Sequence, residues 1–178
     1  MINRFTFLRA LGATAAGAAL PGCLTLHGTG QSPRYWPTQP FAKVRGFAYA
    51  CEVGKNVSFF QKDGRLHPGI LNGPGVVLTD DQANRLLKAL TTPTPRQGRT
   101  ACYVPHHAFV FYDKADRPVA HVEICFTCRH SKFSPGGLPS HFDYQALWAL
   151  VHELGLPAGT TPKYYHKLFT LKYPQAAQ

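Results

Sequence analysis

Two apolar segments on either side of a polar turn constrain the fold of this chain most strongly. Residues 109–112 and 119–126 are rich in aromatic and β-branched side chains, and residues 113–118 separate them. This pattern is typical of two strands joined by a turn. If Tyr112 pairs with Val119, alternation gives one face His107, Phe109, Phe111, Ala120, Val122 and Ile124. The opposite face then carries Ala108, Val110, His121, Glu123 and Cys125. The sequence therefore predicts a β-hairpin with one core face and one mixed face.

Strand signals also occur earlier in the chain. Residues 47–51 (Phe-Ala-Tyr-Ala-Cys) are predicted to form a strand. Asp63-Gly64 predicts a two-residue hairpin turn between residues 57–60 and 65–67, because both central residues of such a turn take positive φ.

Two segments have the marks of capped amphipathic helices. Thr79 and Gln82 form a capping-box pattern before a helix predicted from Asp80 to Leu90. Ser140 and Asp143 are candidate caps for a second helix, which runs to Leu154 and ends at Gly155. Hairpins with two main helices predict a single small α+β domain with a mainly antiparallel sheet.

Residues 1–22 have the layout of a bacterial lipoprotein signal peptide. A cationic start with Arg4 and Arg9 precedes an apolar stretch of the roughly 7 to 15 residues found in export signals, shorter than the about 20 of a membrane span. Leu20-Pro21-Gly22-Cys23 resembles a lipobox, in which the cysteine takes a diacylglycerol and becomes the mature N-terminus. We expect Cys23 to be the lipid attachment site. The alternatives are an ordinary signal peptide or a small buried helix.

The same segment indicates a cellular location. Residues 3–9 are similar to the twin-arginine pattern, but Phe5 replaces its second arginine. We therefore expect general secretory export, with the twin-arginine route as the alternative. Leu24 is not the Asp that retains lipoproteins at the inner membrane. The expected place is the bacterial cell envelope, at the outer membrane and facing the periplasm.

Composition predicts one folded domain after the signal peptide. Hydrophobic residues make up 44% of the chain and charged residues 16%, which excludes a disordered protein. Residues 23–43 carry the lipid-bearing Cys23 and a Pro/Gly-rich tether or wrapped arm, in which Trp36 can pack. Residues 44–173 form the domain, and residues 174–178 are a tail.

The chain is basic, with a net charge of +10. We expect contact with the membrane through the N-terminal lipid, and anionic lipid headgroups or other anionic envelope polymers as candidate partners. A solvated basic surface without a partner is the alternative. No basic run interleaved with aromatics occurs, so we expect no nucleic acid.

Four of the five cysteines remain once Cys23 is lipidated. An oxidising compartment favours disulfides. The hairpin register continues to a pairing of residues 103 and 128, which places Cys102 opposite Cys128, so we expect a Cys102–Cys128 disulfide. Cys51 and Cys125 are then either joined or free. Cys125 and Cys128 can join only if their strand ends near Phe126, since in an extended strand they lie about 10 Å apart.

A metal site is the alternative interpretation of these cysteines. Thiolate and imidazole ligands suit zinc or copper(I). The candidate ligand set is Cys102, His107, Cys125 and Cys128, with His106 as the alternative histidine. No cofactor is expected under the disulfide interpretation. A thiol oxidoreductase is disfavoured, because this C-x-x-C ends a strand rather than starting a helix.

We assign no catalytic residues. The sequence has no G-x-S-x-G, Walker or H-E-x-x-H motif. His121 and Glu123 alternate on one strand, and such a pair is commonly a solvated charge pair. The chain is therefore expected not to be an enzyme, with an unrecognised hydrolase as the remote alternative.

Residues 102–128 also carry a resemblance. Cys102-Tyr-Val-Pro-His-His107, Val110-Phe-Tyr-Asp113, Val119-Ala-His121 and Ile124-Cys-Phe-Thr-Cys128 resemble a pattern in a group of uncharacterised bacterial exported proteins and lipoproteins. The resemblance brings no named activity. We expect a lipid-anchored envelope protein with a binding or envelope-support role, or alternatively a metal-binding or thiol-containing module.

Overall fold

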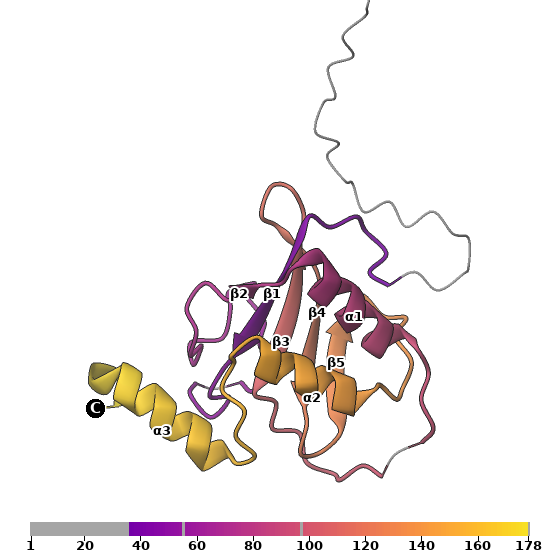
Figure 1. Cartoon of the computed structure of the whole chain (residues 1–178). Helices are drawn as coiled ribbons and strands as arrows, with labels where there is room; N and C mark the ends of the chain where they lie inside the picture. Colours follow the sequence, from indigo (N-terminus) through magenta and orange to yellow (C-terminus); the bar gives the residue numbers. More distant parts are fainter. Residues whose placement is uncertain (1–35, 55, 97, 178) are drawn as a thin grey trace, which may run out of the picture. The chain divides into compact units, whose positions relative to one another are not determined.

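The computed structural model describes residues 36–54, 56–96 and 98–177. The predicted signal peptide, Cys23 and the tether as far as Tyr35 lie outside these residues. Five strands form one sheet in the order β2-β1-β3-β4-β5, and every neighbouring pair is antiparallel. Their bounds are β1 Lys43–Ala48, β2 Val76–Val77, β3 His107–Tyr112, β4 Pro118–Cys125 and β5 His130–Ser134. The predicted α+β fold with a mainly antiparallel sheet is therefore confirmed (Figure 1).

The hairpin of β3 and β4 has the predicted faces. Phe109 pairs with Val122 and Phe111 with Ala120, as a pairing of residues 112 and 119 requires. The register shifts next to the turn, however, and Tyr112 pairs with Pro118, so that Val119 is the extra residue of a bulge. The predicted register thus holds along the hairpin and is wrong only at its turn.

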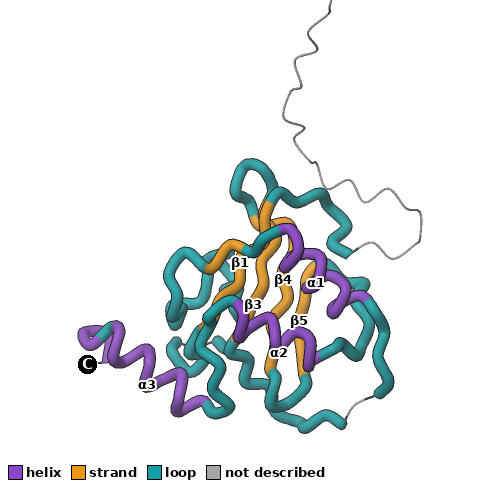
Figure 2. Tube along the Cα trace, in the orientation of Figure 1, coloured by secondary structure: helices purple, strands orange, loops and turns teal. Residues whose placement is uncertain are grey.

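Two capped helices cover one face of the sheet (Figure 2). Helix α1 (Asp80–Thr91) begins with the predicted capping box of Thr79 and Gln82. Helix α2 (Tyr144–Glu153) is capped by Asp143, and Gly155 beyond its end has a φ of +64°. The two helices bury an apolar stripe against β1, β3 and β4, which includes Leu86, Leu90, Leu147, Leu150 and Val151.

The opposite face of the sheet is covered by an irregular segment, residues 51–71, of which the structure describes all but residue 55. Phe59, Phe60 and Leu66 from this segment pack over Phe47 and Val110. The hairpin predicted around Asp63-Gly64 is wrong as a pair of strands, because only Phe60 and Leu66 form an isolated bridge. The apolar side chains of this segment pack on the sheet, and its backbone forms no extended ladder.

Four features differ from the sequence prediction. The first strand runs from Lys43 to Ala48 and not over residues 47–51, and strand β5 extends the sheet beyond β4. Helix α3 (Pro162–Lys172) follows α2, begins at the cap Thr161 and buries Tyr165 and Phe169. A short 3-10 helix, η1 (Pro174–Ala177), ends the described chain.

The arm before the sheet is part of the domain. Trp36 is buried, and its indole Nε1 donates a hydrogen bond to the Pro135 carbonyl at 2.7 Å. Its ring packs edge-on against Phe111 with the centroids 5.0 Å apart. Among the residues described, no helix has the length and apolar character needed to cross a bilayer.

Candidate metal and thiol sites

The four cysteines of the domain gather at one end of the sheet. The chain beyond β1 continues beside β3, where Tyr49 N–H donates to the His106 carbonyl at 2.9 Å, and reaches Cys51 two residues later. Strand β4 ends at Cys125. Cys102 and Cys128 form a disulfide, with Cα atoms 5.7 Å apart, which closes the open end of the hairpin. The predicted disulfide is thus present, and Cys51 and Cys125 are buried free thiols.

Cys125 lies beside this disulfide. The Sγ atoms of Cys102, Cys125 and Cys128 all lie within 4.8 Å of one another, and we call them the three-sulfur cluster. The backbone N–H of Cys128 donates to Cys125 Sγ at 3.3 Å. Arg129 has a φ of +50°, which turns the chain into β5. Cys125 and Cys128 are buried, whereas Cys102 is exposed.

A second group of ligand-type atoms lies near this end of the sheet. One atom each of Cys51, Glu52 and His106 lies within 4.8 Å of the others, and we call this group the thiol–imidazole site. The Cys51 and His106 side chains are buried, while the Glu52 side chain is 30% exposed. Cysteine, glutamate and histidine are all zinc ligand types, and neither disulfide cysteine belongs to this group. The group can therefore hold a metal ion without any change in the Cys102–Cys128 disulfide.

Hydrogen bonding fixes the His106 ring. Its Nδ1 lies 3.0 Å from the Tyr49 carbonyl oxygen, which can only accept, so Nδ1 carries the proton in neutral His106. Nε2 then presents a lone pair. This atom is buried, has no hydrogen-bond partner among the described residues, and lies 3.7 Å from Glu52 Oε1. A backbone acceptor on one ring nitrogen is the usual way of orienting a histidine that binds metal through the other.

The electrostatics of the thiol–imidazole site disfavour a free nucleophile. Burial, with a further contribution from Glu52, raises the pKa of Cys51 to about 12. Burial also lowers the pKa of His106, so the imidazole is neutral near pH 7. A cysteine nucleophile needs a stabilised thiolate. A bound cation instead deprotonates a coordinating thiol and offsets its repulsion with the carboxylate.

The structure does not bring His107 to the cysteines. His107 pairs with Ile124 and shares the core face, and its Nε2 lies 2.8 Å from the Pro157 carbonyl oxygen. Burial lowers its pKa to about 4. Of the ligand set predicted from sequence, Cys102, Cys125 and Cys128 come together without His107. Strand alternation could have identified His106 as the histidine nearer the cysteines. Neighbouring residues face opposite sides of a sheet, so His106 points away from the core face that holds His107.

Glu123 is also buried near the cysteines. Its side chain accepts a hydrogen bond from the Tyr103 hydroxyl at 2.9 Å, and burial raises its pKa. The His121 ring packs on Phe60, with the centroids 4.5 Å apart, and burial lowers its pKa to about 4. The interpretation of His121 and Glu123 as a solvated charge pair is therefore wrong, because residues 51–71 cover this face.

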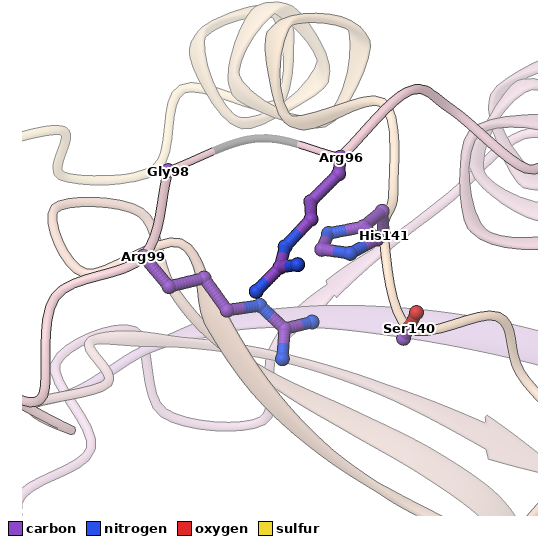
Figure 3. Close-up of a pocket in the computed structure, with 5 residues that line it drawn as sticks. All are labelled: Arg96, Gly98, Arg99, Ser140 and His141. Carbon is purple, nitrogen blue, oxygen red and sulfur yellow. The ribbon is translucent and has the colours of Figure 1, made fainter.

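A basic pocket of about 630 Å³ lies elsewhere on the domain, lined by Arg96, Gly98, Arg99, Ser140 and His141. Figure 3 shows the guanidinium groups of Arg96 and Arg99 and the imidazole of His141 turned toward a common space. Within the described part of the chain, neither arginine forms a salt bridge. Concentrated positive charge of this kind suits an anion.

Comparison with protein-family models, with curated proteins and with solved structures found no match to this chain.

Proposed function

We propose that this chain is a lipid-anchored protein of the bacterial cell envelope that binds a zinc ion at the thiol–imidazole site. The ligands are Cys51 Sγ, a Glu52 carboxylate oxygen and His106 Nε2. The observation that carries the proposal is the buried Nε2 of His106, which has no hydrogen-bond partner among the described residues. An unpaired buried nitrogen costs free energy, and a metal ion would satisfy it.

The donor set selects the metal. Thiolate and imidazole suit both zinc(II) and copper(I), but a carboxylate oxygen is a hard ligand that favours zinc over copper(I). Three protein ligands leave a fourth tetrahedral position for water or another ligand. Glu52 is an exposed residue at the solvent side of the group, which gives the ion a route of entry.

The location in this proposal depends on Cys23 and on the leader before it. A diacylglycerol at Cys23 would hold the domain at the membrane by residues 24–35. Zinc binding itself does not depend on the anchor, so the two parts can be tested separately.

The test is zinc affinity, measured on the full-length protein by competition with a chromophoric chelator. We expect one zinc ion per chain, with Cys51→Ser and His106→Gln losing this stoichiometric binding. His166→Gln, an exposed histidine on α3, is the matched control and should bind as the wild type. Glu52→Gln changes an exposed ligand and carries little risk to folding. Equal zinc affinity in the wild type and in all three ligand variants would exclude the site.

A second candidate function is the binding of an anionic envelope component in the basic pocket. The specific observation is that Arg96 and Arg99, neither in a described salt bridge, turn toward one space with His141 (Figure 3). Arginine binds phosphate through paired N–H donors. The chemistry is therefore that of a phosphate group, whether free or in a lipid headgroup.

Vesicle sedimentation separates this pocket from general basicity. We expect Arg96→Gln and Arg99→Gln to weaken binding to phosphatidylglycerol vesicles more than Arg65→Gln, which removes the same charge from an arginine paired with Asp63. Inorganic phosphate competes if the pocket recognises the phosphate group itself. Equal losses in all three variants would leave only nonspecific attraction.

A further inference from the structure

We propose that the thiol of Cys125 exchanges with the Cys102–Cys128 disulfide, so that the domain presents a reactive thiol at Cys102. This activity is independent of the thiol–imidazole site. It arises from a free thiol and a disulfide that lie side by side: the three Sγ atoms are within 4.8 Å of one another. Thiol–disulfide exchange proceeds by attack of a thiolate on a disulfide sulfur.

Hydrogen bonds are available to both sulfur anions that the exchange involves. The Cys128 N–H already donates to Cys125 Sγ at 3.3 Å and points at the sulfur that attacks. Thr100 Oγ1 lies 3.1 Å from Cys102 Sγ, and the hydroxyl must be the donor because a disulfide sulfur carries no proton. The same hydroxyl would stabilise a departing Cys102 thiolate.

The turn after β4 makes the product disulfide, Cys125–Cys128, geometrically possible. In an extended strand, Cys125 and Cys128 would point to opposite faces, with Cα atoms about 10 Å apart. Strand β4 ends at Cys125, however, and residues 126–129 form a turn that returns the chain to β5. This turn brings the Cys125 and Cys128 sulfurs into the three-sulfur cluster.

The step balances without any other reactant. The Cys125 thiol loses its proton, and its thiolate attacks Cys128 Sγ. The Cys125–Cys128 bond forms as the Cys102–Cys128 bond breaks. Cys102 leaves as a thiolate that takes up the released proton, so the number of disulfides and thiols is unchanged.

The exchange moves a thiol from a buried position to an exposed one. Cys125 is 1% exposed, whereas Cys102 lies on the surface. An exposed Cys102 thiolate can attack a disulfide of a second molecule, forming a mixed disulfide and releasing the other half as a thiol. The chemical class of partner is therefore a small or exposed disulfide.

Alkylation trapping in the native full-length protein tests the exchange. The protein is incubated with iodoacetamide and no reductant, quenched in acid, digested in acid without reduction, and mapped. We expect alkylated Cys102 to accumulate together with a Cys125–Cys128 linked peptide. Cys125→Ser should keep the Cys102–Cys128 link, with Cys102 unmodified. Thr127→Ser, a conservative change of an exposed residue in the same turn, is the matched control and should behave as the wild type.

Two results would overturn the proposal. One is an intact Cys102–Cys128 pair in the wild type after prolonged incubation, with no alkylation at Cys102. The other is alkylation of Cys102 that is equal in Cys125→Ser and in the wild type, since Cys125 would then not be the attacking thiol. If Cys125→Ser does not fold, Cys125→Ala serves in its place. If neither variant folds, the wild-type peptide map decides the outcome alone.

Discussion

The imidazole of His106 stacks on the ring of Tyr165, with centroids 3.8 Å apart and planes at 8°. The contact joins α3, which the sequence prediction lacked, to the thiol–imidazole site. Tyr165 is itself fixed, because its hydroxyl donates to the Gly159 carbonyl at 2.9 Å. Tyr165 therefore acts as a positioning residue for His106.

Substitution of Tyr165 should separate stacking from hydrogen bonding. Tyr165→Phe keeps the ring and loses the hydroxyl, so we expect a stability loss of about 1 kcal/mol with zinc affinity retained. Tyr165→Leu removes the stacked ring, and we expect zinc affinity to fall about tenfold, as for other residues that orient metal ligands. Urea unfolding and chelator competition measure the two effects. Equal zinc affinity in both variants contradicts a positioning role.

Reduction of the Cys102–Cys128 disulfide should destabilise the domain. The bridge spans 26 residues and restricts the unfolded chain. We expect its loss to lower the free energy of unfolding by about 2–4 kcal/mol, measured by urea unfolding with and without a strong dithiol reductant. A midpoint unaffected by reductant would mean that the disulfide is absent from the native protein.

Stability should fall in acid through His121. Burial lowers its pKa to about 4, against about 6.5 in an unfolded chain. Between these values the unfolded state binds more protons. The stability contribution is therefore complete above about pH 6.5, declines by about 3 kcal/mol as the pH falls from about 6.5 to about 4, and is absent below that. Glu123 acts in the opposite direction, because burial raises its pKa.

The His121→Phe variant isolates this histidine, because the new ring can still pack on Phe60. Its stability should decline less steeply from pH 6.5 to 4 than that of the wild type, with Glu123 unchanged in both. An NMR titration of His121 gives a direct check. A pKa at or above 6.5 would show that the ring is not held neutral by burial.

The predicted anchor has its own test. Cys23→Ser should still be exported but should fractionate without detergent, because no diacylglycerol is attached. Mass spectrometry of the wild type should find a mature N-terminus at Cys23 with acyl mass. Membrane retention that is the same in Cys23→Ser would contradict lipid attachment at this residue.

Local patterns in the sequence predicted the hairpin, its disulfide and the helix starts. Alternation along β3 and β4 sets which residues face each other, and two strands joined by a short turn leave few alternatives. The Thr79–Gln82 cap and the Asp143 cap also depend on neighbouring residues alone. The half-exposed residues of β5 and the aromatic-rich α3 carry weaker periodicity, so both were missed.

The sequence by itself determined that Cys102 meets Cys128 and that the two faces of the hairpin differ, because both follow from strand periodicity. Only the tertiary structure decided that Cys51 and Glu52 meet His106. That meeting requires β1 to pair with the free edge of β3, more than fifty residues later in the chain, and Ala48 to lie opposite His107. The residues of a strand do not by themselves specify which distant strand it pairs with. The pairing of β1 with β3 depends on how the whole domain packs. Residues 51–71 must be buried on one face of the sheet, and α1, α2 and α3 elsewhere in the domain.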